Sequence, residues 1–183
     1  MPDIFLSPVV KQLYSYPNGG NEREWMNRLA DVMQSQLKAG GIRCVRSPKN
    51  MGLRAAVELA NRSAYDLYLS FGTACAPADA QGMRKGACFR YYEHSPTGKQ
   101  AALRLMENYK KVYPEPELVS AAAATTFFAL RGSAAPAVMI SLAYHDNPQD
   151  EIWLTGNIEE IGRNLSDSLA EQFPVKVRRG QTA

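Results

Sequence analysis

Short apolar runs alternate along this chain with longer stretches of helical periodicity, and this alternation limits the folds that the chain can adopt. The expected strands are residues 4–8, 42–46, 65–71, 87–92 and 137–143. The expected helices are residues 21–39, 53–61, 99–113 and 157–173, while residues 125–130 fit either a strand or a helix. Strands that alternate with helices predict an α/β fold, a three-layer sandwich with a mostly parallel central sheet flanked by helices.

The segment 137–143 is apolar except for Ser141, which is typical of a strand buried on both faces of a sheet. In sheets of this kind, functional sites form at the carboxyl ends of the strands. Those ends are expected at residues 7–10, 71–75 and 141–146.

The length and composition of the chain indicate one ordinary globular domain, because 183 residues can bury a sizeable core and 45% of them are hydrophobic. We expect this domain at residues 1–174, followed by a basic tail at 175–183. The net charge is only +3 and no long run of like charge occurs, so no nucleic-acid partner is expected. No run of 18 apolar residues occurs, so no membrane contact is expected either. The three cysteines lack metal-binding spacing and predict no disulfide framework.

Glu22 is the first candidate for a functional side chain. Asn21 and Glu24 form a capping pair at the start of a helix, which accounts for Glu24. Glu22 lies four residues before Met26 and seven before Leu29, so it extends the apolar face of that helix. It is either a partly solvated first-turn glutamate favoured by the helix dipole or a ligand-binding carboxylate.

Ser141, Cys75 and the two histidines are further candidates. Ser141 fits a buried serine bonded to a backbone carbonyl, or a nucleophile paired with His145, although the Gly-x-Ser-x-Gly motif is missing. His94 and His145 lie in turn-like segments, where turn hydrogen bonds are the simpler role. Cys75 fits a small buried hydrophobic residue, or a metal ligand or reactive thiol.

Five segments, in this order, carry a resemblance to a known family: SPVVKQ, YPNGGNEREWMNRLAD, GIRCVRS, LANRSAYDLYLSFGTACAP and PAVMISLAYHDNP. Together they resemble the zinc-dependent N-acetylmuramoyl-L-alanine amidases of the amidase type 3 family, over residues 4–173. The resemblance implies a bacterial cell-wall context and hydrolysis of the amide between muramic acid and L-alanine in peptidoglycan. It also implies a zinc ion held by two histidines and a glutamate, with a second glutamate as the catalytic base.

Position by position, the resemblance places the first zinc histidine at Val10, with no histidine at the two positions after it. The metal-binding glutamate falls on Glu22, the second histidine on Gly72, and the catalytic glutamate on Ser141. We call Val10, Glu22, Gly72 and Ser141 the four family positions. Only Glu22 keeps the family's side chain, so the resemblance implies a degenerate zinc site.

The leading expectation is therefore a catalytically inactive amidase-like protein, without a cofactor, that binds peptidoglycan fragments or a protein partner. Its cleft would be lined by Tyr14, Tyr16, Glu22, Thr73, Cys75, Ser141 and His145. The alternative is an active hydrolase with a rebuilt zinc site made from Glu22, Cys75, His145 and Asp146. A third reading keeps only the fold and assigns an unrelated ligand.

The first residues have neither the basic start nor the long apolar core of a signal peptide. This favours a cytoplasmic location, or release to the cell wall by a route that this sequence does not encode.

Overall fold

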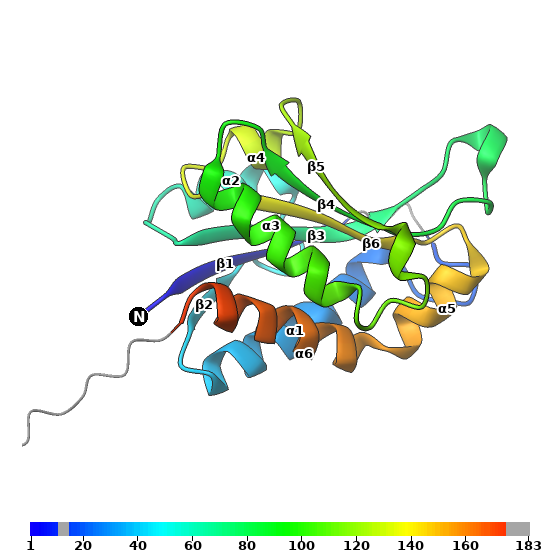
Figure 1. Ribbon diagram of the computed structural model, residues 1–183, viewed down its shortest axis with the longest axis horizontal. Coiled ribbons are helices and arrows are strands. Elements are labelled where there is room, and N and C mark those ends of the chain that lie inside the picture. Colours follow the sequence, from blue (N-terminus) through cyan, green and yellow to red (C-terminus); the bar gives the residue numbers. More distant parts are fainter. Residues whose placement is uncertain (11–14, 175–183) are drawn as a thin grey trace, which may run out of the picture.

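The computed structural model describes residues 1–10 and 15–174 (Figure 1). Its strands are β1 Asp3–Pro8, β2 Arg43–Arg46, β3 Leu67–Ala74, β4 Ala87–Tyr92, β5 Val119–Ala124 and β6 Ala137–Tyr144. Its helices are α1 Glu22–Ala39, α2 Leu53–Ala60, α3 Pro96–Tyr109, α4 Phe128–Arg131, α5 Pro148–Gly156 and α6 Ile158–Gln172. Two short 3₁₀ turns, at Ala78–Ala80 and Pro116–Leu118, complete the elements. Tyr14 and the expected basic tail lie outside the described residues.

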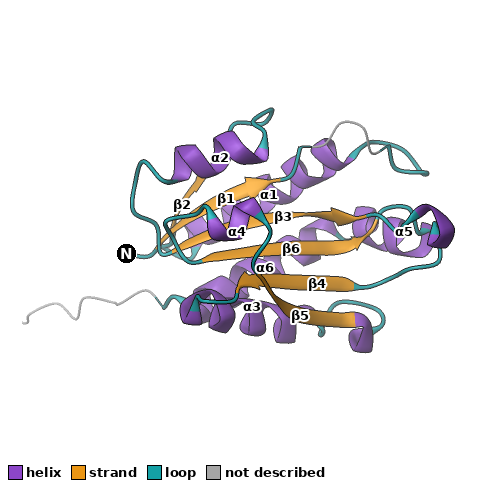
Figure 2. Ribbon diagram, turned by 90° about the horizontal axis from the view of Figure 1, so that it is seen from above, coloured by secondary structure: helices purple, strands orange, loops and turns teal. Residues whose placement is uncertain are grey.

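The six strands form one sheet in the order β2-β1-β3-β6-β4-β5. Strands β2, β1, β3 and β6 are parallel, whereas β4 is antiparallel to β6 and parallel to β5. The expected mostly parallel sheet is confirmed. The carboxyl ends of β2, β1, β3 and β6 therefore lie at one edge of the sheet. Strands β4 and β5 run the opposite way, so their carboxyl ends lie at the other edge (Figure 2).

Helices cover both faces of the sheet, which confirms the three layers. Helices α1, α3 and α6 cover one face and enclose the larger core, in which α1 packs closely on α6 (Figure 1). A Cβ on Gly162 of α6 would lie 2.5 Å from Cγ1 of Val32 on α1, so this helix contact depends on a glycine. Among the described residues, the other face carries the two short helices α2 and α4, with a smaller core around Phe5 and Tyr68 (Figure 2). This second face therefore has less helical cover.

The start of α1 follows the sequence pattern closely. Asn21 Oδ1 accepts a hydrogen bond of 3.1 Å from the backbone N–H of Glu24, as the capping pair predicts. Met26 and Leu29 are fully buried, and Glu22 on the same face is only 1% exposed. The expectation of a partly solvated first-turn glutamate is wrong, because the apolar face of the helix carries Glu22 into the protein.

The structure differs from the expected elements in the C-terminal half. The polyalanine segment 121–124, for which no strand was predicted, belongs to β5 and pairs with residues 89–92 of β4. Alanine has little intrinsic preference for strands, so this pairing is a tertiary effect. Helix α5 was also not predicted, although Asn147 caps it through hydrogen bonds from the N–H groups of Gln149 and Asp150.

The ambiguous segment 125–130 contains the start of the short helix α4, and α3 begins at Pro96 rather than at residue 99. Among the described residues, no helix is long and apolar enough to cross a membrane.

Candidate active-site remnant

The carboxyl ends of β1, β3 and β6 meet the first turn of α1, and this meeting point brings the four family positions together. Gly72 on β3 lies opposite Ser141 on β6, and Val9 N–H donates to Phe71 O at 2.8 Å. A pocket of about 320 Å³ opens here, which we call the strand-end pocket. Its lining residues are Val9, Val10, Glu22, Gly52, Leu53, Ser70, Gly72, Thr73, Phe127, Met139, Ile140 and Ser141.

The carboxylate of Glu22 is held by Thr73. Glu22 Oε1 accepts hydrogen bonds from the backbone N–H of Thr73 at 2.7 Å and from its hydroxyl at 2.9 Å. Hydrogen bonds to an ionised acceptor are stronger than neutral ones and stabilise its charged form. The one retained family side chain is therefore engaged by the neighbouring strand.

The hydroxyl of Thr73 also joins Glu22 to two aromatic rings. Tyr16 OH donates to Thr73 Oγ1 at 3.2 Å, and His145 Nδ1 lies 3.0 Å from the same oxygen. The Thr73 hydroxyl has only one hydrogen to donate. When it donates this hydrogen to Glu22, Thr73 Oγ1 acts as the acceptor for His145, and His145 Nδ1 carries the proton of that hydrogen bond. The rings of Tyr16 and His145 stack with their centroids 5.5 Å apart. Burial raises the pKa of Tyr16 well above its usual value, which keeps the phenol protonated as a donor.

Gly72 leaves no room for a larger side chain without a shift of its neighbours. A Cβ built on Gly72 would lie 2.9 Å from Glu22 Oε1 and 2.9 Å from both Cβ and Cγ2 of Val9. Real Cβ atoms do not approach other heavy atoms this closely. The space next to β3 is therefore already filled by Glu22 and Val9.

Ser141 is bonded to a cation from the neighbouring strand. Its Oγ accepts a hydrogen bond of 3.0 Å from Nη1 of Arg90 on β4, and the Arg90 guanidinium lies 5.5 Å from the ring centre of Phe127. The expected backbone carbonyl partner for Ser141 is wrong, and His145 contacts Thr73 rather than Ser141. The strand pairing explains this: Cys88 lies opposite Ser141, so Arg90 is its diagonal neighbour on the same face.

Sequence reasoning did not select Arg90. An arginine in the middle of the apolar strand 87–92 was the available signal, since a charge in such a segment needs a partner.

The described side chains do not form a zinc site. Tetrahedral zinc needs at least three nitrogen, sulfur or carboxylate ligands from the protein. Among residues 1–10 and 15–174, no three histidine, cysteine, aspartate or glutamate side chains come together. Val10, Gly72 and Ser141 supply no imidazole or carboxylate at the family positions. The donor set present therefore does not fit the catalytic zinc of the family.

The residues proposed for a rebuilt zinc site serve other contacts. Asp146 accepts hydrogen bonds from the N–H groups of Ala76 at 3.1 Å and Gly82 at 2.9 Å, which tie down the loop after β3. Cys75 is exposed, so the expectation of a small buried residue is wrong for it.

The segment after β6 is a second set of polar contacts that sequence reasoning missed. Glu151 is fully buried, and its carboxylate accepts hydrogen bonds from the backbone N–H of Asn18 at 3.0 and 3.2 Å. Asp150 accepts hydrogen bonds from Tyr113 OH, from Tyr144 N–H at 2.8 Å and from Gly86 N–H at 3.1 Å. Burial raises the pKa of Asp150. These carboxylates tie Asn18, before α1, and Gly86, before β4, to the segment that follows β6.

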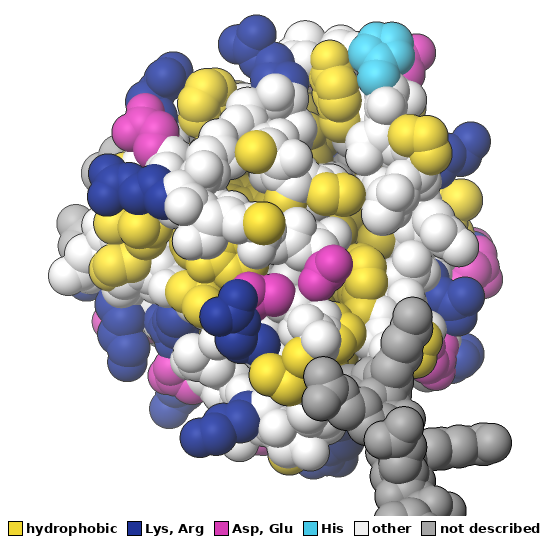
Figure 3. All heavy atoms as spheres, turned by 90° about the vertical axis from the view of Figure 1, so that its left-hand side faces the viewer, with side chains coloured by type: hydrophobic (Ala, Val, Ile, Leu, Met, Phe, Trp, Pro, Cys, Tyr) yellow, Lys and Arg dark blue, Asp and Glu magenta, His cyan; other side chains and the backbone are white. Residues whose placement is uncertain are grey.

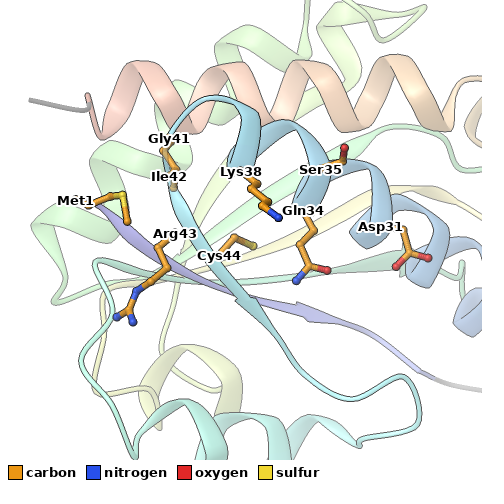
Figure 4. A pocket seen from close by; sticks show the side chains of 9 residues that line it. All are labelled: Met1, Asp31, Gln34, Ser35, Lys38, Gly41, Ile42, Arg43 and Cys44. Atoms are coloured by element: carbon orange, nitrogen blue, oxygen red, sulfur yellow. The ribbon is translucent and has the colours of Figure 1, made fainter. Parts of the chain in front are cut away.

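A separate pocket of about 610 Å³ lies between α1 and β2 (Figure 4). None of the four family positions lines it. Cys44 lines this pocket, and burial raises the pKa of its thiol to about 12.

On the face drawn in Figure 3, basic, acidic and hydrophobic side chains are interspersed.

Comparisons with known proteins agree with this geometry. The N-acetylmuramoyl-L-alanine amidase family matches residues 13–171, whereas no curated protein gives a significant match. Cwp6 from Clostridium difficile superposes with a TM-score of 0.82 at 18% identity, over 94% of this chain and 29% of Cwp6. This chain thus spans less than a third of that protein.

Two other solved structures match over nearly their whole length. The catalytic domain of CwlV, an N-acetylmuramoyl-L-alanine amidase from Bacillus (Paenibacillus) polymyxa, gives a TM-score of 0.81 at 15% identity, over 96% of this chain and all (100%) of that domain. The CwlD amidase from Clostridioides difficile, solved with the GerS lipoprotein, gives a TM-score of 0.81 at 13% identity, over 94% and 98%. At these identities the structures establish the shared fold, and the family match covers most of the chain. The protein belongs to the N-acetylmuramoyl-L-alanine amidase family.

Proposed function

We propose that this protein is a catalytically inactive member of the amidase family that binds peptidoglycan fragments in the strand-end pocket. The proposal depends on which side chains occupy the four family positions and on what those side chains contact. Glu22 is bonded to Thr73, and Val10, Gly72 and Ser141 supply neither zinc ligands nor a base.

The chemistry of amide hydrolysis explains why these substitutions matter. A catalytic zinc ion is held by three protein ligands and lowers the pKa of a bound water to about 7. A general base contributes about 10²–10⁴-fold to the rate, and Ser141 cannot accept a proton as a carboxylate does. Its Oγ instead faces the Arg90 guanidinium, which disfavours any protonation there.

Binding is a separate matter from hydrolysis, because a pocket is lined by the four positions to which the resemblance assigns the family's site. It is lined largely by apolar side chains with a few polar groups, the usual composition of a small-molecule site. A protein partner is the second candidate, supported by the CwlD structure, in which an amidase of this fold is bound to a lipoprotein.

The test combines metal analysis, binding and turnover on one sample. We would purify the protein without chelator, measure zinc by elemental analysis, and incubate it with a purified muramoyl peptide. We expect no stoichiometric zinc and binding without release of free peptide.

The control variant is Glu22→Gln, which can still accept from Thr73 and should keep the fold. About one zinc per chain together with turnover, both lost in Glu22→Gln, would refute the proposal and support the rebuilt hydrolase.

A further inference from the structure

We propose that the strand-end pocket recognises a carboxylate group on an apolar ligand, specifically the free carboxyl end of a short peptide with small aliphatic side chains. This inference rests on the proposed function, since it names which part of a peptidoglycan fragment enters the pocket.

The first donor group is the N-terminus of α2. This eight-residue helix begins beside the pocket, which Gly52 and Leu53 line. Its N-cap residue, Gly52, has no side chain to accept a hydrogen bond, and its first turn contains no acidic residue. The intrahelical ladder begins with Ala56 N–H to Gly52 O, so the N–H groups of residues 53–55 precede it. Such N–H groups and the helix dipole attract anions.

The second donor is a buried hydroxyl in the wall of the pocket. Ser70 lines the pocket and is 0% exposed, and its Oγ has no hydrogen-bond partner among the described residues. Buried hydroxyls are normally paired, because leaving one unpaired costs free energy. A ligand oxygen in the pocket would supply the missing partner.

The third donor is Ser141. Its Oγ accepts a hydrogen bond from Arg90, and the hydroxyl can donate its own hydrogen to a further acceptor. A hydroxyl that accepts from a guanidinium is polarised and becomes a better donor. Gly72 and Ser141 are opposite each other, and Ser70 is two residues from Gly72, so both hydroxyls lie on the same face of the sheet.

One carboxylate, that of Glu22, also lines the pocket and opposes anion binding. Its Oε1 already accepts two hydrogen bonds from Thr73, and the Arg90 guanidinium that donates to Ser141 brings a positive charge to another side chain of the pocket wall. With Oε1 of Glu22 bonded to Thr73, the donors left for a ligand are the uncapped N–H groups of α2 and the serine hydroxyls.

The rest of the pocket sets the shape of the ligand. Apolar side chains form most of the wall: Val9, Val10, Leu53, Phe127, Met139 and Ile140. About 320 Å³ is at the small end of ligand pockets, which suits one or two small aliphatic residues. A bare phosphate would leave this apolar wall exposed to water, so a peptide carboxylate fits better.

The test uses Gly52→Asp. A Cβ at Gly52 meets nothing within 4 Å, and its backbone (φ −69°, ψ 158°) is the extended conformation that N-cap residues adopt. The new carboxylate would cap α2 itself and compete with the ligand. We expect unchanged or higher thermal stability, and affinity for N-acetyl-alanyl-alanine reduced by about tenfold.

Two controls accompany it. Gly52→Ala adds a Cβ without a charge and should keep the affinity within about twofold, because it leaves the N–H groups open. The C-terminal amide of the same dipeptide should bind about tenfold more weakly than the acid to the unmodified protein. Ser70→Ala should weaken binding of the acid with no loss of thermal stability, because that hydroxyl has no partner in the described part of the fold.

The outcomes separate this inference from the proposed function. Equal affinity for acid and amide, or acid binding unchanged in Gly52→Asp, refutes the carboxylate site even if a muramoyl peptide binds. Acid binding that is lost in Gly52→Asp, without any binding of the muramoyl peptide, supports the site and refutes the proposed function. Absence of binding to both ligands refutes both.

Discussion

Replacing Gly72 by alanine tests whether the space beside β3 is closed at the position that the resemblance assigns to a zinc histidine. The added Cβ would lie 2.9 Å from Glu22 Oε1 and from Cβ and Cγ2 of Val9. The Glu22 carboxylate sits at the end of a flexible side chain, but the Val9 Cβ is fixed to the backbone. Val9 N–H in turn donates to Phe71 O at 2.8 Å, so relief of the contact must move the chain after β1.

Overpacking of this kind costs about 1–3 kcal/mol, and the backbone contact places Gly72→Ala in the upper half of that range. For a chain of this size, each kcal/mol corresponds to about 2–4 °C in the melting temperature. We therefore expect a fall of roughly 4–12 °C, and a lower urea midpoint with an unchanged m-value.

The matched control is Gly156→Ala at the end of α5, where a Cβ meets nothing within 4 Å. It should be neutral or stabilise the protein by about 0.4–1 kcal/mol, because alanine reduces the freedom of the unfolded chain. A Gly72→Ala protein as stable as the Gly156→Ala protein would refute the close-contact argument. The larger Gly72→His should be at least as destabilising and should not bring stoichiometric zinc into the protein.

Three further predictions concern Thr73, the buried carboxylate of Glu151 and the thiol of Cys44. Thr73→Val should cost about 1–3 kcal/mol in urea unfolding, because it removes the hydroxyl that joins the buried polar groups, while Thr73→Ser should recover most of the loss. Glu151→Ala should speed amide hydrogen exchange at Asn18 and lower stability by about 2–3 kcal/mol, and unchanged exchange would mean that this carboxylate does not hold the loop. The pKa of Cys44 is raised from 9.0 to about 12, so the unfolded chain loses this proton first and stability should fall as the pH rises from 9 toward 12. That fall should be smaller in Cys44→Ala, and Cys75, which is exposed, should react with a thiol reagent faster than Cys44 at every pH in between.

Much of the fold follows from local patterns in the sequence. The capping pair of Asn21 and Glu24, the apolar stripe of α1 and the apolar run of β6 predicted those elements and the burial of Glu22's face. β5 could not be predicted in the same way, because Ala121–Ala124 has no period and becomes a strand only by pairing with β4.

The candidate site was also predictable only in part. The resemblance and the expected strand ends predicted that Glu22, Gly72 and Ser141 would lie close together, because this depends only on the order of the strands. The partner of each side chain could not be predicted, because it depends on register. Arg90 reaches Ser141 only because β4 runs antiparallel to β6 with Cys88 opposite Ser141.

The segment that follows β6 has a consequence for the order in which this protein is assembled. His145, Asp146, Asp150 and Glu151 contact residues that lie 72, 70, 64 and 133 positions earlier in the chain. Contacts over such separations form late, because they close long loops. During synthesis, most of the sheet has left the ribosome before these four side chains have been made. We therefore expect the loops of the N-terminal half to stay open until the last third of the chain is in place. A chain that stops before residue 145 would lack all four of these contacts.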